Sequence, residues 1–572
     1  MPEAEGAVSF WNAASECSRG TPGVRRHRVT RIAACAYAVA LATTIACGKG
    51  GDGTVTTEPP LPPVTNPVLP QTYVPTGRSA AGDVLVHLFE WRWRDVAREC
   101  EVWLGPKGFK AVQVSPPTEH AVINDASASF PWWQRYQPVS YKLDVSRSGT
   151  AAEFAEMVQR CRNAGVDIYV DAVFNHMTAG SGTGSAGSRY TKYGYPAVPY
   201  GEIDFHTACG INSYNDAFQV QRCELVGLSD LRTEADTVRG RIAAYLSTLV
   251  QLGVAGFRID AAKHIAPVDV DAIMAKVNAA TLAAGKGRPY VFLEVINNPG
   301  EAVTAQQYFG VGYASGGAAD VTDFLYGYRL TDAFTGRNGG TLNALFLGLT
   351  TPSLPSDKSV VFVDNHDNQR GDNLYYALPG YEQAVVFMLA YPLGYPSVMS
   401  SFGFEHGSPR GRDAGPPSDN AGVTHSTFDA SGASNCTVTL GSQQPDRWIC
   451  EHRRLAIANM VAFRKAAAGT PLSPCGRSEW SIGGDPNRVA FCRDGAGFVA
   501  LSRSATPVTE LLPTRLPAGT YCNVALFVFV VASGAQPASC TGAAIVVQGD
   551  GSAMIPLSAN GMVALHLRAR IS

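Results

Sequence analysis

Three carboxylate residues, each closing a short apolar run, could take part in one reaction. Asp260 ends "GFRID", Glu294 ends "VFLE" and Asp367 ends "FVDNHD". One such residue alone is most often a helix cap, but three that converge repel one another, and proteins tolerate that crowding where function needs shifted pKa values. The set suits glycoside hydrolysis: one carboxylate attacks the anomeric carbon, a second protonates the leaving oxygen, and a third stabilises the oxocarbenium-like transition state.

These carboxylates need a fold that brings the ends of separate segments together. From about residue 83, short apolar strands alternate with helical stretches, which calls for a parallel sheet. We expect strands at 83–91, 111–117, 167–176, 254–261, 290–295, 319–324, 359–367 and 397–401. We expect helices at 96–104, 151–165, 236–252, 267–284, 301–309, 340–349 and 380–390. The prediction is an α/β fold: a (β/α)₈ TIM barrel, whose active site lies at the C-terminal strand ends, with a long insertion after strand 3 and a C-terminal all-β sandwich domain.

The order of these segments gives a domain division. It comprises a signal at 1–47, a Pro/Thr/Gly-rich linker at 48–80, the barrel at 81–176 and 231–470, an inserted domain at 177–230 and the β domain at 471–572. Within the first part, a basic stretch precedes the apolar run 32–46, which is too short to span a membrane and has the length of a signal core.

Cys47 follows that apolar run and resembles the acylated cysteine of a bacterial lipoprotein signal. Thr44 stands where such signals usually have Leu, so plain secretion stays open. We therefore expect an exported protein, either secreted or held at the cell surface by a lipid on Cys47.

The remaining cysteines and the charge narrow the class further. Ten cysteines follow Cys47, an even number that indicates disulfides in an exported chain. Proximity along the chain predicts the pairs 209–223, 436–450, 475–492 and 522–540, which leaves 100–161. A formal net charge of −2 offers no electrostatic basis for binding a nucleic acid, and we expect a monomer.

Four segments, "DAVFNH", "GFRIDAAKH", "FLEVI" and "FVDNHD", resemble in order and spacing the signature segments of the α-amylase family of glycoside hydrolases. Flanking stretches such as "HLFEWRW" and "PWWQRYQPVSYKL" resemble its animal-type branch, and the similarity extends from about residue 83 to the C-terminus. The resemblance implies Asp260 as nucleophile, Glu294 as acid/base and Asp367 as transition-state stabiliser. It implies starch, glycogen and maltooligosaccharides as substrates.

The same resemblance implies a set of substrate contacts. Tyr136 would stack under the reacting sugar, and Arg258 would hold Asp260 ionised. The full implied set is Trp132, Trp133, Tyr136, Gln137, His176, Arg258, Lys263, His264 and His366. Packing at the barrel mouth is the alternative explanation for the aromatic members.

A calcium ion between barrel and insertion is also implied by the resemblance. Asn175 and Asp230 match its side-chain ligands, and the backbone carbonyls of Gln221 and His264 complete the set; oxygen donors are what this cation prefers. Without the resemblance, Asn175 would be read as a turn residue and Asp230 as a cap.

Chloride is a different case. Many animal-type members bind an activating chloride through two basic residues and an Asn, and Arg258 and Asn365 match two of these positions. The third position holds Ser397, a neutral residue. We therefore expect that chloride is not required.

Three functions fit the sequence. The first is a calcium-dependent, retaining α-amylase that cuts internal α-1,4 bonds. The second, in the same family, is an exo-acting maltooligosaccharide-forming enzyme or a transglycosylase. The third is a non-catalytic surface glucan-binding protein, which would have no need of the complete set Asp260, Glu294 and Asp367.

Overall fold

The computed structural model describes residues 82–572 except 126–127, 309–318, 438–446 and 534–535. The predicted signal, Cys47 and the linker lie outside these residues. Eight parallel strands close into a barrel in the order β1-β14-β13-β12-β11-β10-β5-β2. The strands are β1 (Leu85–Leu88), β2 (Ala111–Val114), β5 (Asp167–Ala172), β10 (Gly256–Ile259), β11 (Tyr290–Leu293), β12 (Asp320–Asp323), β13 (Ser359–Val361) and β14 (Tyr395–Ser400). The predicted barrel is confirmed.

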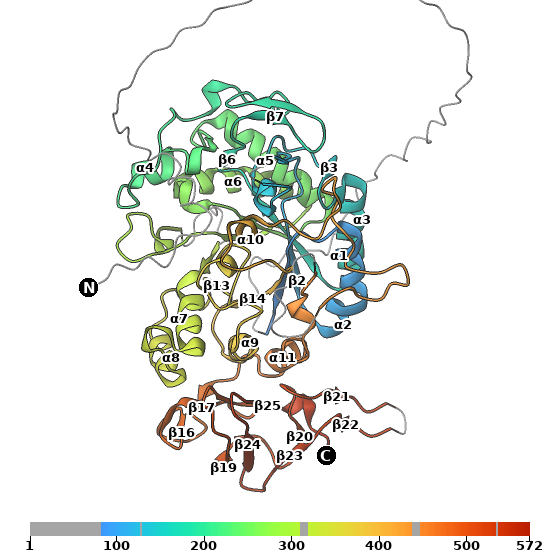
Figure 1. Cartoon of the computed structure of the whole chain (residues 1–572), viewed down its shortest axis with the longest axis vertical. Helices are drawn as coiled ribbons and strands as arrows, with labels where there is room; N and C mark the ends of the chain where they lie inside the picture. The colour runs from blue at the N-terminus through green and yellow to red at the C-terminus, as the bar shows by residue number, and fades with distance from the viewer. Residues whose placement is uncertain (1–81, 126–127, 309–318, 438–446, 534–535) are drawn as a thin grey trace, which may run out of the picture.

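Helices surround the barrel (Figure 1). They are α1 (Trp93–Glu99), α3 (Ala151–Asn163), α5 (Asp236–Leu252), α6 (Pro267–Ala283), α7 (Phe324–Thr335), α8 (Leu342–Leu349), α9 (Tyr381–Ala390) and α11 (Leu455–Ala466). No described helix is long and apolar enough to cross a membrane.

Two helix expectations were wrong. The helix expected at 301–309 is only a 3-10 turn, Ala305–Tyr308. The sequence reading missed α7 altogether, although its signals are present: the Asp323 side chain accepts a hydrogen bond from the backbone N–H of Tyr326, and Gly336 ends the helix in the left-handed region. The apolar run expected as a strand at 319–324 continues directly into this helix, so no break separates the two.

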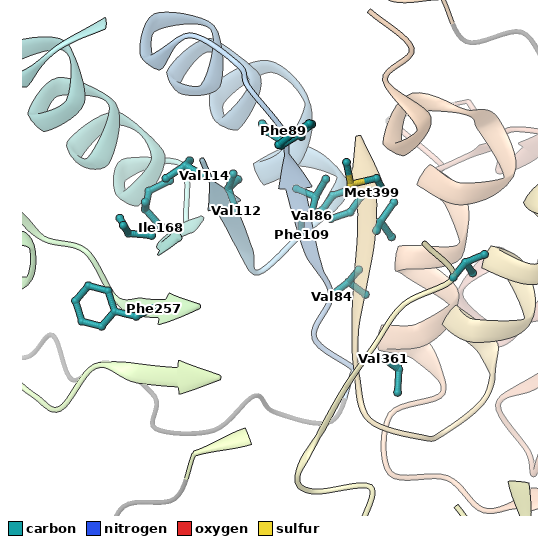
Figure 2. Packing of buried hydrophobic residues seen from close by; sticks show 14 of the residues in the cluster. Val84, Val86, Phe89, Phe109, Val112, Val114, Ile168, Phe257, Val361 and Met399 are labelled. Carbon is teal, nitrogen blue, oxygen red and sulfur yellow. The ribbon is translucent and has the colours of Figure 1, made fainter. Parts of the chain in front are cut away.

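The barrel strands are buried on both faces, as expected where helices cover a parallel sheet. Figure 2 shows buried residues of β1, β2 and β14, among them Val86, Val114 and Met399, which belong to one continuous cluster. Side chains of successive residues point to opposite faces of a strand. The strands can therefore pack apolar residues against the helices on one face and point polar residues into the barrel on the other. Arg258 and Asp171 are such polar residues, and they lie opposite each other on neighbouring strands.

The insertion after β5 is tied back to the barrel by a short antiparallel ladder. In this ladder β6 (His176–Met177) pairs with β9 (Ser229–Asp230), and His176 lies opposite Asp230. The insertion also contains β7 (Ser181–Thr183), β8 (Arg189–Thr191) and α4 (Ala217–Arg222). The ladder places the two ends of the insertion side by side at the mouth of the barrel.

The C-terminal region is all-β, as predicted. One antiparallel sheet has the order β15 (Leu472–Ser473), β17 (Asp485–Arg493), β18 (Gly497–Ser502) and β25 (Met562–His566), with β16 (Ser481–Ile482) paired to β17. A second sheet has the order β19 (Val508–Pro513), β24 (Ser552–Leu557), β23 (Ala544–Val547) and β20 (Gly519–Cys522). Buried side chains from both sheets, such as Phe498 and Ile555, form one core between them. All five predicted disulfides are present: Cys100–Cys161, Cys209–Cys223, Cys436–Cys450, Cys475–Cys492 and Cys522–Cys540.

Candidate active site

The three predicted carboxylates meet at the C-terminal end of the barrel. The parallel ladder continues one residue past the strands, because the N–H of Asp260 donates to the Ala172 carbonyl and the N–H of Glu294 donates to the Ile259 carbonyl, each at 3.0 Å. Asp367 lies just beyond β13. All three carboxylate residues are buried.

The Arg258 guanidinium is the centre of this cluster. Its Nη1 lies 2.8 Å from Asp260 Oδ1 and 2.6 Å from Asp171 Oδ1, and its Nη2 lies 2.8 Å from Glu294 Oε1. One cation therefore contacts three carboxylates, and it fixes Asp260 and Glu294 on two sides of the same planar group.

The negative charge of this cluster exceeds its positive charge. Burial raises the pKa of Asp260 well above its usual range; Arg258 opposes this effect, while Glu294, Asp171 and Asp367 add to it. Burial also raises the pKa of Asp367, with Glu294 as the next cause. Arg258 lowers the pKa of Asp260, as expected, but it does not outweigh burial and the neighbouring carboxylates, so the cluster binds protons more tightly than isolated carboxyl groups do.

Glu294 is oriented by the backbone that follows Asp260. Ala261 has φ +48°, in the left-handed region that costs a residue with a side chain about 1 kcal/mol or more. In that conformation the N–H of Ala261 donates to Glu294 Oε2 at 2.7 Å. The strained turn thus holds one carboxyl oxygen of Glu294 beside Asp260.

Aromatic rings form one wall of the site. The rings of Tyr136 and His366 stack with centroids 4.9 Å apart, and Trp132 meets each of them edge-on. The Tyr136 hydroxyl donates to Asp171 Oδ2 at 2.9 Å, and His176 Nε2 lies 2.9 Å from the Tyr136 carbonyl. These contacts fix the orientation of the Tyr136 ring beside the carboxylates.

The remaining predicted contacts surround this centre. Trp133 Nε1 donates to Asp413 Oδ1, Gln137 accepts from Thr178 Oγ1, and His264 Nδ1 lies 2.8 Å from the Val220 carbonyl. Lys263 Nζ donates to the Ile296 carbonyl at 2.7 Å and forms an ion pair with Glu301.

Two residues of the site were missed by sequence reasoning. Asp171 lies within the apolar strand β5 and was not among the predicted site residues, yet it accepts hydrogen bonds from Arg258, Tyr136 and Gln113. A charged residue inside an otherwise apolar, buried strand was the available signal.

Arg370 is the second missed residue. Its Nη1 donates to the His366 carbonyl at 2.7 Å, and its guanidinium carbon lies 4.5 Å from the Phe404 ring centroid and 5.1 Å from that of Trp132. Arg370 therefore joins the backbone that carries Asp367 to the aromatic wall. Its position one turn after Asp367 was the only signal in the sequence.

The expected calcium ligands lie on neighbouring stretches of backbone, in two pairs. The β6–β9 ladder pairs His176 with Asp230, and directly beside this pair the N–H of Leu231 donates to the Asn175 carbonyl at 3.0 Å. The contact between His264 and Val220 brings the carbonyl-bearing end of α4, with Gln221, to the barrel. Among the described residues, no cluster of three or more His, Cys, Asp and Glu side chains is placed to hold a metal.

The chemistry of that donor set still fits calcium. The set contains only one carboxylate and relies otherwise on an amide and backbone carbonyls, all of them oxygen donors. Burial raises the pKa of Asp230 to about 7, against the effect of His206, whose Nδ1 lies 2.6 Å from Oδ2. A cation at this carboxylate would offset the cost of burying its charge.

The fold and this site together define an enzyme of the (β/α)₈ class with an acid/base carboxylate centre. The family description "Alpha amylase, catalytic domain" matches residues 108–282. The alpha-amylase of Tribolium castaneum is 44% identical over 499 residues, which cover 85% of this chain and 94% of that protein. The pancreatic alpha-amylase of Sus scrofa is 42% identical over 529 residues, which cover 87% and 97%.

Solved structures agree. Alpha-amylase I from Eisenia fetida superposes with a TM-score of 0.74 at 37% identity, over 86% of this chain and 98% of that one. A mutant of the same Eisenia fetida protein, in complex with maltohexaose, matches with the same TM-score and identity. The chain belongs to the alpha-amylase family and is a glycoside hydrolase.

Proposed function

We propose that the chain cuts internal α-1,4 bonds of starch, glycogen and maltooligosaccharides with retention of configuration. Asp260 attacks the anomeric carbon, while Glu294 gives its proton to the leaving oxygen. Glu294 then takes a proton from the water that opens the glycosyl–Asp260 ester. Asp367 stabilises the positive charge that develops on the sugar ring in both steps.

The contact of one guanidinium with both Asp260 and Glu294 carries this proposal. Both carboxyl groups lie within hydrogen-bond distance of one planar group, an arrangement compatible with the roughly 5 Å separation of a retaining pair. Proton NMR of fresh product should detect the α-anomer first. The β-anomer as first product would contradict retention.

The balance between endo and exo action is tested by the products. An endo-acting enzyme releases a broad early mixture of oligosaccharides from soluble starch, whereas an exo-acting enzyme releases one short product from the start. A transglycosylase would form chains longer than its maltooligosaccharide substrate. A protein without reducing-sugar release would be the non-catalytic glucan binder.

Calcium is the next part of the proposal. Asn175, Asp230 and the carbonyls of Gln221 and His264 would hold the ion, which would tie the insertion to the barrel beside the cleft. Because a ligand that binds only the native state stabilises it, a chelator should lower both the melting temperature and the activity. Restoration of both by added Ca²⁺ but not by Mg²⁺ would complete the test.

We also propose that turnover does not need chloride. Ser397 and Asn365 line a cavity of about 20 Å³ beside Arg258, which is roughly the room that one water needs. Arg258 is already shared among three carboxylates, and burial lowers the pKa of His87, which also lines the cavity, to about 3, so His87 is neutral there. An anion would find too little positive charge to offset its desolvation.

The chloride proposal predicts equal activity with chloride and with a non-halide anion at fixed ionic strength and neutral pH. Ser397→Arg is the complementary variant, because it would supply the second cation. Saturable activation of the unmodified enzyme by chloride would contradict the proposal.

Export is supported by the five disulfides, which form in oxidising compartments. We propose that the apolar run 32–46 directs this export and that Cys47 carries a lipid. Growth with a labelled fatty acid should label the chain but not its Cys47→Ser variant. Absence of label in both would favour plain secretion.

A further inference from the structure

A hairpin of the C-terminal domain exposes an unusual number of aliphatic side chains. The hairpin is formed by β21 (Phe529–Val530) and β22 (Ser539–Cys540). Exposed side chains line its first arm, with exposed fractions of 44% for Leu526, 37% for Val528, 45% for Val530 and 71% for Val531. These four residues are called the apolar arm below.

This arm of the hairpin carries apolar side chains on both of its faces. Phe527 and Phe529, between its members, pack inward against the core, so Leu526, Val528 and Val530 form the outward face. A strand with one face in water normally carries polar residues on that face. Moreover, no Asp, Glu, Lys, Arg or His stands in the sequence between Arg515 and Asp550.

The base of the arm is also held in place. The Cys522–Cys540 disulfide closes the base of the hairpin. Asn459 of α11 donates through Nδ2 to the carbonyls of Val524 and Phe527, each at 3.0 Å. A surface fixed in this way loses little conformational entropy when it is covered by a partner.

The hairpin lies at the end of the molecule away from the catalytic cleft. Figure 1 shows β21 and β22 on the C-terminal domain, while the insertion with β6, β7 and α4 lies at the opposite end. The described chain begins on the hairpin's side: Gly82 lies against Lys465 and Ala468, at the end of α11 that follows Asn459.

We propose that the apolar arm inserts into the boundary between headgroups and acyl chains of a lipid bilayer, with the catalytic cleft facing away from the membrane. Aliphatic side chains without charge suit that boundary. A glucan is recognised instead by stacking rings and hydrogen-bonding groups, which the outward face of the arm does not offer.

The length of chain before Gly82 supports this choice of partner. The sequence places 34 residues between Cys47 and Gly82, so a lipid at Cys47 would keep this end of the molecule within that length of chain of the membrane. The insertion of the arm does not depend on acylation or on the catalytic mechanism.

Flotation with phosphatidylcholine vesicles tests the proposal on the chain from residue 48 onward, without the apolar run 32–46 and Cys47. Every described element and all five disulfides lie in this chain. It should float with the vesicles, and Val531→Asp should lower the bound fraction at least about tenfold. Val268→Asp, on α6, is the matched control, because Val268 has the same 71% exposed fraction.

Both variants should keep the melting temperature and starch-degrading activity of the parent chain, since both side chains are exposed. Two results would overturn the proposal: no flotation of the folded parent chain, or equal flotation of the Val531→Asp and Val268→Asp variants. Loss of starch-granule binding in Val531→Asp, or a change from dimer to monomer in sedimentation, without any lipid effect, would assign the arm to a glucan or to a second copy and would also overturn it.

Discussion

Two buried clusters in this molecule both pair carboxylates with basic side chains, but they differ in the ratio of negative to positive charge. In the catalytic cluster, one Arg258 faces Asp260, Glu294 and Asp171. On the flank of the barrel, a single carboxylate, Glu99, receives hydrogen bonds from both His452 and Arg453.

The pKa directions separate the two clusters. Burial raises the pKa of Glu99, but the hydrogen bonds from His452 and Arg453 outweigh it, so the net pKa is lowered. The pKa of Asp260 is raised, and its Oδ2 has no partner within the described residues. A buried carboxylate with donors on both oxygens is structural, whereas one with a free oxygen and an excess of like charges is ready to react.

The largest contrast is expected at the catalytic cluster. Asp260→Asn and Glu294→Gln should each lower kcat on soluble starch by several orders of magnitude, because they remove the nucleophile and the proton donor. The melting temperature should not fall, since each change relieves repulsion among carboxylates. Activity within tenfold of the parent for either variant would refute its assigned role.

Glu99→Gln should show the reverse pattern. The neutral amide has one oxygen for the donors of His452 and Arg453, and its NH₂ group faces a remaining donor, so a largely buried cation loses its counter-charge at a cost of about 3 kcal/mol. Urea unfolding followed by tryptophan fluorescence measures this loss. The kcat of the folded fraction should be unchanged, and a large drop in kcat at full folding would break the distinction between the clusters.

A buried neutral histidine should give a smaller effect that depends on pH. Burial lowers the pKa of His120 to about 3, Nδ1 lies 2.8 Å from the Ala121 carbonyl, and Nε2 accepts from the Arg147 N–H. The unfolded chain therefore binds a proton on His120 more tightly than the folded chain does. Neutral His120 contributes its full stabilisation above pH 6.5, and this stabilisation is lost as the pH falls from 6.5 toward 3.

At pH 5 this loss amounts to about 2 kcal/mol. A glutamine at position 120 cannot be protonated. Between pH 7 and pH 5 the unfolding free energy of the His120→Gln variant should therefore fall by about 2 kcal/mol less than that of the parent protein. Parallel slopes for the two proteins in urea unfolding would show that His120 is not the titrating group.

The smallest effect is expected where the charges are exposed. Arg160 forms ion pairs with Glu101 at 2.7 Å and Glu156 at 3.0 Å, but all three side chains are partly exposed to solvent. Arg160→Gln should cost at most about 1 kcal/mol, and 0.5 M salt should reduce that cost. A loss of unfolding free energy as large as that of Glu99→Gln would mean that geometry, not burial, sets how much these ion pairs contribute to stability.

The sequence alone determined the barrel, its insertion and the pairing of the cysteines. Alternating strands and helices leave few arrangements other than a closed parallel sheet, and cysteines close along the chain have little choice of partner. It also singled out Asp260, Glu294 and Asp367, because each lies at the end of an apolar run.

Only the tertiary structure decided how these groups share charge. The distances from Arg258 to three carboxylates depend on the register of β5, β10 and β11, which closure of the barrel fixes and no single segment encodes. For the same reason, Asp171 and Arg370 were recognised only once their partners were known. An uncharged run can be read in the sequence, but which of its side chains remain in contact with water depends on what packs against them: Phe527 turns inward while Val528 stays exposed.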